Sequence, residues 1–314
     1  MRLIDRFLIV LMLGVLFVGC ASKEKKETAN TSSTSVTSAP KSFERPIPPV
    51  MMTNPRDRAD YLTTRYWNNF DYTDTMYCHS EFTEQAFSEF IYIVSLASYG
   101  KVSEGVKKLL DSAEVNEVMY NYFYKQGEKY LYDPNSPTRN DEFFIPFLEH
   151  IVTSSKVMEE SKIRPRLLLQ LAYRNRVGSR AEDIVYTTES GRSGRLYTIS
   201  ARYILLMFYN PDCMECQLTT NELKSSSVIT SAVSSGRLKV LAVYPDENMD
   251  IWRNHLNDFP SSWINGYDKS LVIRTNQTYD LKAIPTLYLL DENKHVILKD
   301  TSVGHLHDYL EQNQ

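Results

Sequence analysis

The pattern of apolar and polar positions divides the chain into four stretches. Residues 7–19 are apolar without interruption, and residues 20–49 carry almost no apolar side chain. Between residues 50 and 178, apolar side chains recur every three or four positions, which predicts amphipathic helices. From about residue 179, short and wholly apolar runs alternate with amphipathic segments. We therefore expect an all-α domain over 50–178 and an α/β domain over 179–314.

The apolar runs also place the individual elements. Residues 203–209 are apolar throughout, which is typical of a central strand covered on both faces, and residues 238–244 are expected to be a second buried strand. The other elements follow from helical or extended patterns. Helices are expected over residues 56–69, 83–94, 103–110, 115–131, 143–152, 166–175, 217–233, 249–257, 271–281 and 305–312, and further strands over 196–199, 263–268, 286–290 and 295–299.

Length and composition are those of an ordinary globular protein of two domains. The chain has 314 residues, of which 42% are hydrophobic and 24% charged, and its formal net charge is −4. At about 100–200 residues per domain, this length predicts two domains. A slightly acidic balance without a basic block argues against nucleic acid as the main partner. Four cysteines are too few for a disulfide scaffold.

The first twenty residues have the pattern of an export signal followed by a lipid anchor. Arg2 and Arg6 make a positive start, and an apolar run follows over residues 7–19. This run is shorter than the roughly 20 residues that a membrane-spanning helix needs. It leads into Leu-Phe-Val-Gly-Cys at 16–20, which resembles the lipobox of bacterial lipoproteins. The resemblance implies cleavage after residue 19 and lipid on Cys20, whereas an uncleaved anchor helix is the alternative.

Residues 20–49 are expected to be a flexible linker. They are first charged, then rich in Ser and Thr, then rich in Pro, and they cannot bury enough apolar surface to fold. Lipid on Cys20 would hold the protein on the periplasmic side of a bacterial membrane, expected to be the outer membrane. Disulfide chemistry is permitted in that compartment.

The helical stretch is rich in tyrosine, including Tyr120, Tyr122 and Tyr124. Aromatic side chains fill cores but are also common at binding surfaces, and periodicity alone does not separate the two, although core packing is favoured. Cys78 lies beside His79, but no third group is seen that would orient them. We interpret Cys78 as a buried or incidental cysteine rather than a redox residue.

Three segments of this stretch resemble a helical domain of unknown function that occurs in lipoproteins of Bacteroidota. They are Arg-Ala-Asp-Tyr-Leu at 58–62, Tyr-Trp-Asn-Asn-Phe-Asp at 66–71 and Thr-Glu-Gln-Ala-Phe at 83–87. The resemblance covers residues 50–178 and implies no chemistry.

A pair of cysteines, Cys213 and Cys216, stands between a predicted buried strand and a predicted helix. At a helix N-terminus, unpaired N–H groups and the positive end of the dipole favour a thiolate at Cys213. The thiolate is the species that attacks disulfides. Cys216 lies one turn further on the same side of the helix and can attack the resulting mixed disulfide. The pair can therefore cycle between dithiol and disulfide without a cofactor.

Other uses of the pair fit less well. A zinc site needs two more ligands, and there is no second cysteine pair. Covalent haem attachment needs a His directly after the pair, where Gln217 stands. A structural disulfide would close too short a loop to gain much entropy. A peroxidase would carry Thr or Ser three residues before its reactive cysteine, but Asn210 precedes Cys213 at that spacing. We predict no metal and no cofactor.

Residues 208–216, Phe-Tyr-Asn-Pro-Asp-Cys-Met-Glu-Cys, resemble the active-site turn of the thioredoxin superfamily, in its membrane-tethered, extracytoplasmic thiol–disulfide oxidoreductase branch. Ile284 and Pro285 stand where that family has a cis-proline facing the sulfurs, and an Ile–Pro bond adopts cis at modest cost. The resemblance covers residues 179–314 and implies a central mixed sheet flanked by helices. It makes Cys213 the nucleophile, Cys216 the resolving thiol, and Ile284 and Pro285 the edge that binds an extended substrate.

Asp212 and Glu215 depart from the usual turn of this family. Their negative charge opposes formation of the Cys213 thiolate, so we interpret them as residues that tune the pair toward giving electrons. Full solvation of both charges, which would make them nearly silent, is the alternative. Trp252 and Trp263 are expected to pack in the core rather than to contact substrate.

Together these features predict an extracytoplasmic reductase of disulfides in client proteins. Its partners would be a disulfide-bearing client, a thiol donor in the membrane, and the membrane itself through lipid on Cys20. The helical domain would select the client or cover the active site. The alternatives are a non-catalytic binding or assembly lipoprotein with a thioredoxin-like scaffold, and a thiol peroxidase.

Overall fold

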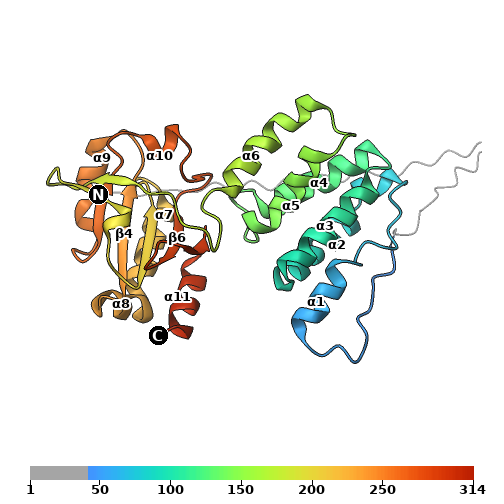
Figure 1. Cartoon of the computed structure of the whole chain (residues 1–314), viewed down its shortest axis with the longest axis horizontal. Coiled ribbons are helices and arrows are strands. Elements are labelled where there is room, and N and C mark those ends of the chain that lie inside the picture. The colour runs from blue at the N-terminus through green and yellow to red at the C-terminus, as the bar shows by residue number, and fades with distance from the viewer. Residues whose placement is uncertain (1–41) are drawn as a thin grey trace, which may run out of the picture. The chain divides into compact units, whose positions relative to one another are not determined.

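A computed structural model describes residues 42–314 (Figure 1). The expected signal peptide over 1–19, the lipid-bearing Cys20 and most of the expected linker lie outside the described residues. Among the helices of the described part, none has the length and apolar character needed to cross a bilayer. The described residues all belong to one compact unit.

The first half of the described chain is helical, as predicted (Figure 1). Asparagine side chains at positions 54, 116 and 140 accept hydrogen bonds from backbone N–H groups in the first turns of three helices, which satisfies groups that a helix start leaves unpaired. The helices are α1 (Pro55–Thr63), α2 (Glu81–Leu96), α3 (Tyr99–Ala113), α4 (Glu117–Leu131), α5 (Asp141–Thr153) and α6 (Ile163–Tyr173), with 3₁₀ turns at Thr75–His79 and Glu159–Lys162.

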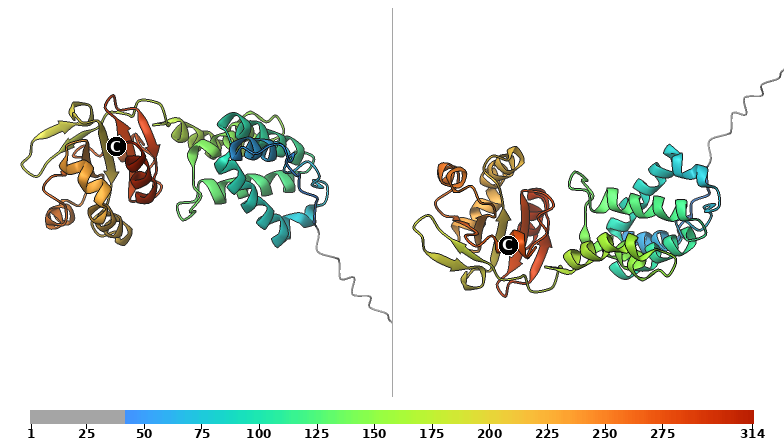
Figure 2. Two further views of the ribbon diagram at one scale, coloured as in Figure 1. Left: turned by 90° about the horizontal axis from the view of Figure 1, so that it is seen from below. Right: turned by 90° about the horizontal axis from the view of Figure 1, so that it is seen from above.

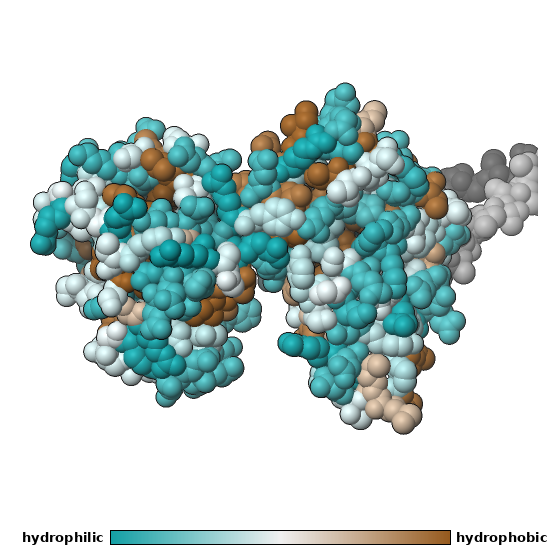
Figure 3. All heavy atoms as spheres, in the orientation of Figure 1, coloured by the Kyte–Doolittle hydropathy of each residue, from teal (hydrophilic) through white to brown (hydrophobic). Residues whose placement is uncertain are grey.

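Aromatic side chains form most of the helical core. The buried rings of Trp67 and Phe123 meet edge to face, with centroids 5.0 Å apart. Tyr66 and Tyr120 are buried in the same core, so the expected packing role of the tyrosines is confirmed for these residues, whereas Tyr92 is exposed. On the face drawn in Figure 3, apolar residues gather over α6.

The second half is an α/β domain with a mixed sheet, as predicted. The strand order is β2-β1-β5-β4-β3-β6-β7, in which β3 pairs in parallel with β4 and antiparallel with β6. The strands are β1 (Val185–Thr187), β2 (Ser193–Arg195), β3 (Tyr203–Phe208), β4 (Leu238–Tyr244), β5 (Ile264–Tyr267), β6 (Thr286–Asp291) and β7 (Val296–Lys299), and the helices are α7 (Met214–Ser225), α8 (Ser227–Ser234), α9 (Met249–Asn254), α10 (Val272–Thr275) and α11 (Val303–Gln312).

Helices lie on both faces of the sheet (Figure 2). Every residue of β3 is buried, because alternate side chains of a strand point to opposite faces and both faces carry a core. Leu205 and Met207 pack with residues of α7, α8 and α11. Ile204 and Leu206 pack on the other face with Ile273 of α10. The uninterrupted apolar run was therefore a correct sign of a central strand.

The register between β3 and β6 positions the loops that follow and precede them. Phe208, the last residue of β3, pairs with Thr286, the first residue of β6. Because the strands are antiparallel, the segment after Phe208 and the segment before Thr286 lie at the same end of the two strands. This pairing brings Cys213 and Pro285 into one region.

Several predicted elements differ from the structure. The strand expected over 196–199 is a 3₁₀ turn at Leu196–Thr198, because the N–H of Tyr197 donates to the Asp183 side chain, 3.0 Å away, instead of to a neighbouring strand. The helix expected over 271–281 is limited to α10, since Gln277 has a φ of 48°. A left-handed residue ends a right-handed helix.

The long helix expected over 217–233 is two helices, α7 and α8, separated at Ser226. The Ser226 hydroxyl accepts from the N–H of Ile229, which makes Ser226 the N-cap of α8. Its oxygen also lies 3.0 Å from Nδ1 of His307 on α11. Apolar periodicity continues across such a break, so periodicity alone did not reveal it.

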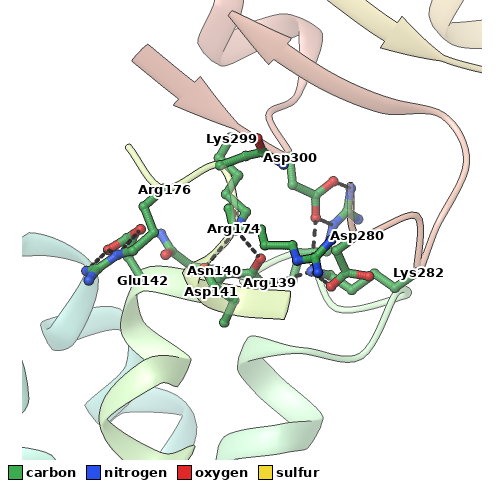
Figure 4. A network of polar contacts seen from close by, with 12 residues as sticks. Arg139, Asn140, Asp141, Glu142, Arg174, Arg176, Asp280, Lys282, Lys299 and Asp300 are labelled. Atoms are coloured by element: carbon green, nitrogen blue, oxygen red, sulfur yellow. Dashed lines mark hydrogen bonds and ion pairs between the residues drawn. The ribbon is translucent and has the colours of Figure 1, made fainter. Parts of the chain in front are cut away.

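Buried ion pairs join the start of α5 to the loop before β6 (Figure 4). Lys282 Nζ lies 2.7 Å from one oxygen of Asp141, and Lys299 Nζ lies 3.0 Å from the other. Burial alone would raise the pKa of the Asp141 carboxyl, but Lys282 and Lys299 together bring this pKa below its ordinary value. Arg139 pairs with Asp300 close by. The helical half and the loop before β6 are thus joined by charges that solvent hardly reaches.

Candidate active site

The turn between β3 and α7 holds the cysteine pair. The Asn210 side-chain oxygen accepts from the N–H of Asp212 at 3.0 Å, and its backbone oxygen accepts from the N–H of Cys213 at 3.1 Å. These bonds reverse the chain after β3 and direct it into α7. Cys213 is the N-cap residue of α7 and Cys216 lies in its first turn, as the sequence predicts.

Cys213 lies against the loop that precedes β6. Its Sγ donates to the carbonyl oxygen of Ile284 at 3.4 Å, and the peptide bond between Ile284 and Pro285 is cis. The Cys213 side chain is half-buried, so it keeps one side open to solvent. The structure therefore brings together the nucleophile and the Ile–Pro pair that were predicted from opposite ends of the domain.

Cys216 lies behind Cys213 and is only 2% exposed. Burial raises the pKa of the Cys216 thiol far above its ordinary value, although the Asn210 N–H, 3.4 Å from Sγ, acts in the opposite direction. The neutral thiol is therefore its resting form in the reduced protein. Both cysteines are free thiols in this structure, so the described state is the dithiol.

The two predicted tuning residues are exposed and lie on different sides of the pair. Asp212 faces His255, whose Nε2 is 3.8 Å from its carboxylate. Glu215 lines a groove of about 500 Å³ together with Ile284 and Pro285. Their effect on the redox balance of the pair stays a prediction.

Sequence reasoning missed His255 and the structural role of Asn210. His255 comes from the segment after α9 and lines a cavity of about 300 Å³ with Cys216 and Gln217. The turn signal Asn210-Pro211-Asp212 was visible in the sequence, and it marked the end of the strand. No local sequence signal predicts the contact of His255 with the turn, because this contact joins segments that are more than forty residues apart.

The remaining candidates have structural surroundings. Cys78 donates to the sulfur of Met119 at 3.7 Å, and burial raises the pKa of its thiol. Trp252 is buried, with its indole N–H donating to Asn265 at 3.0 Å, and Trp263 is buried as well. These positions agree with the packing roles expected for them. Within residues 42–314 no three His, Cys, Asp or Glu side chains gather in a way that could hold a metal ion.

Family models match both halves of the chain. A domain of unknown function, DUF5106, matches residues 19–175, and a thioredoxin-like family matches residues 201–296. No curated protein matches the chain.

Solved structures are similar to the whole described chain or to its α/β half. A thioredoxin-like protein from Bacteroides caccae is 43% identical with a TM-score of 0.83, and the match covers 87% of this chain and 99% of that one. The C-terminal domain of an uncharacterized protein from Bacteroides fragilis is 49% identical over 44% of this chain and 98% of its own, with a TM-score of 0.43. A thiol:disulfide interchange protein from Bacteroides sp. is 21% identical over 44% of this chain and 89% of its own, with a TM-score of 0.39.

Proposed function

Because the chain belongs to the thioredoxin-like proteins that carry an N-terminal DUF5106 domain, we propose that it reduces disulfide bonds of client proteins outside the cytoplasm. The observation that carries the proposal is the position of Cys213. It is the accessible sulfur at the start of α7, 3.4 Å from the Ile284 carbonyl, with Cys216 buried behind it.

The reaction we propose begins with the Cys213 thiolate. It attacks one sulfur of the client disulfide, so that the client S–S bond breaks and a client thiolate leaves. Cys216 then attacks Cys213 Sγ, passing its proton to the leaving client sulfur. The second client sulfur is thereby released as a thiol, and the client thiolate that left first takes up the proton that Cys213 gave up. Two electrons and two protons pass to the client, and the protein keeps a Cys213–Cys216 disulfide.

The charges beside the pair support the reductive direction. A dithiol–disulfide pair is strongly oxidising when its reduced form is stabilised, as it is by a stable thiolate. Asp212 and Glu215 add negative charge beside Cys213, which opposes the thiolate that the start of α7 favours. They therefore weaken that stabilisation, so the pair gives up its electrons more readily. A second dithiol protein, which we propose lies in the membrane, would reduce the disulfide again.

The proposed location rests on the N-terminal sequence. The apolar run over 7–19 and the Leu-Phe-Val-Gly-Cys sequence at 16–20 are typical of an exported lipoprotein, and we propose lipid on Cys20 and a periplasmic position at the outer membrane. An exported position suits a dithiol enzyme, because client disulfides persist there.

Reduction of insulin disulfides with dithiothreitol as donor tests the proposal. We expect the full-length protein to accelerate the reaction, Cys213→Ser to abolish the acceleration, and Cys78→Ser to leave it unchanged. Cys216→Ser should accumulate a mixed disulfide between Cys213 and the client, because no resolving thiol remains; mass spectrometry detects it. A wild type without acceleration would favour a non-catalytic scaffold, and peroxide turnover that depends on Cys213 would favour a thiol peroxidase.

A further inference from the structure

A groove runs beside the Ile–Pro loop and is lined from both halves of the chain. It has a volume of about 500 Å³. One wall is the loop between α4 and α5, another is one face of α7, and the floor is the Ile–Pro loop with the start of β6 and of α11. Its lining includes Asn135, Arg139, Glu215, Glu222, Ile284 and Pro285.

The wall from the helical half is held in place. Arg139 donates to both oxygens of Asp300, at 2.8 and 3.2 Å, and to the carbonyl of Pro134 at 3.0 Å. The N–H of Asn135 donates to Asp133 at 2.8 Å. Asp141, at the start of α5 directly after this loop, is paired with Lys282, two residues before Ile284 (Figure 4). The helical half therefore contributes a fixed wall, so that the groove exists before a client arrives.

The charge of the groove is negative. Glu215 and Glu222 are exposed, and neither forms an ion pair with any residue of the described part. Arg139 is the only cation among the described lining residues, and Asp300 neutralises it. Two carboxylates without partners therefore lie along one side of the groove.

Glu222 has no apparent role in stabilising its own helix. Glu215 is in the first turn of α7, where a negative charge is favourable, but Glu222 is in the last turn. There a carboxylate meets the negative end of the helix dipole, which is unfavourable by about 0.3–1 kcal/mol. Binding of a positively charged ligand would account for a carboxylate at this position of α7.

We infer that the groove binds an extended client segment that carries a basic residue near its disulfide cysteine, and that the DUF5106 half forms one wall of this site. The inference rests on the proposed function and adds its substrate class. Glu222 lies nine residues after Cys213, about 13 Å along a helix at 1.5 Å per residue. An extended chain covers that distance in about four residues, so the Lys or Arg stands about four residues from the client cysteine.

Single-turnover reduction of model peptides tests this inference. The peptides are disulfide-linked and self-quenched, and differ only in having Lys, Gln or Glu four residues to either side of the cysteine. The reduced full-length protein should react fastest with the Lys peptide and slowest with the Glu peptide. The difference between them should shrink at high salt, because exposed charges are screened within about 10 Å at 0.1 M.

Two variants and two matched controls assign the preference to the groove. Glu222→Gln and Asn135→Lys should each slow reduction of the Lys peptide about two- to fivefold, as expected for single exposed charge pairs, and quicken that of the Glu peptide. Glu189→Gln and Asn293→Lys change exposed residues in distant turns. Asn293 even matches Asn135 in donating its N–H to an Asp two residues earlier at 2.8 Å. Both controls should behave like wild type.

The outcomes separate the inference from the function on which it rests. Equal rates with the three peptides, or a preference that survives Glu222→Gln and Asn135→Lys, would overturn the inference and leave the reductase intact. If the wild type reduced neither the peptides nor a small neutral disulfide such as hydroxyethyl disulfide, the proposed function would fail and the inference with it.

Discussion

The two sulfurs of one helical turn have different surroundings. Cys213 is half-buried and contacts the Ile284 carbonyl, whereas Cys216 is covered by the core between the sheet and α7. Burial raises the pKa of Cys216 and of the distant Cys78. This difference fits the proposed reaction, in which the sulfur that attacks the client must be accessible and the sulfur that resolves the mixed disulfide need not be.

Alkylation of the reduced protein should follow that order. Each unit by which a thiol pKa rises leaves roughly tenfold less thiolate at neutral pH, so iodoacetamide at pH 7 should label Cys213 well before Cys216 and Cys78. The labelling rate of Cys216 should still be rising above pH 9, because its thiolate forms only above the ordinary thiol pKa. Peptide mass mapping follows each site, and labelling of Cys78 as fast as Cys213 would contradict the assignment.

At the scale of elements, close helix packing depends on particular glycines. Gly127 of α4 lies against the fully buried ring of Phe147 on α5, and a Cβ at Gly127 would lie 2.7 Å from that ring. Gly100, near the start of α3, has no atom within 4 Å of such a Cβ. The two glycines thus differ in their packing, although both are helical.

Alanine at each position separates helix propensity from packing. Gly127→Ala gains about 1 kcal/mol of helix propensity, but overpacking against a buried ring costs about 1–3 kcal/mol, so we expect the free energy of unfolding to fall. Gly100→Ala should leave it unchanged or slightly higher. Urea unfolding followed by circular dichroism measures both, and a stabilised Gly127→Ala protein would show that α4 and α5 move apart at little cost.

At the scale of the whole described chain, the Asp141 network joins the helical half to the loop that carries Ile284. Lys282 is paired with Asp141, at 2.7 Å, and Asp280, at 3.2 Å. Lys299 Nζ also donates to two backbone oxygens at the end of α6. One belongs to Ala172 in the last turn, and the other to Arg174, which directly follows the helix. The position of the groove wall that the helical half provides therefore depends on contacts with residues of the α/β half.

Asp141→Asn should destabilise the protein by about 3 kcal/mol at pH 7, because it leaves buried lysine charge without a full partner. The pKa of Asp141 is lowered on folding, so its contribution is complete above the ordinary Asp value of about 4 and is lost as the pH falls below it. The difference between wild type and Asp141→Asn in urea unfolding should therefore shrink below pH 4. Asp308→Asn, at an exposed position on α11, serves as control, and a difference that grew with acid would contradict the network.

Part of this architecture followed from local sequence signals. The apolar run of β3, the turn residues after it and the cysteine pair predicted a strand, a turn and a helix start, and the structure places them so. Among the mistaken elements are those in which a side chain or a left-handed residue interrupts a continuous pattern, as at Tyr197, Ser226 and Gln277. Such interruptions depend on contacts that periodicity does not contain.

By itself the sequence determined which residues are candidates for the chemistry and which segments are helix or central strand, because those signals arise between near neighbours in the chain. The tertiary structure alone decided what surrounds the cysteine pair. The pairing of Phe208 with Thr286 brings Ile284 to Cys213, and the pairing of Asp141 with Lys282 joins the helical half to the groove. These contacts link residues far apart in the chain, and sheet register and packing fix them only when the whole domain has formed.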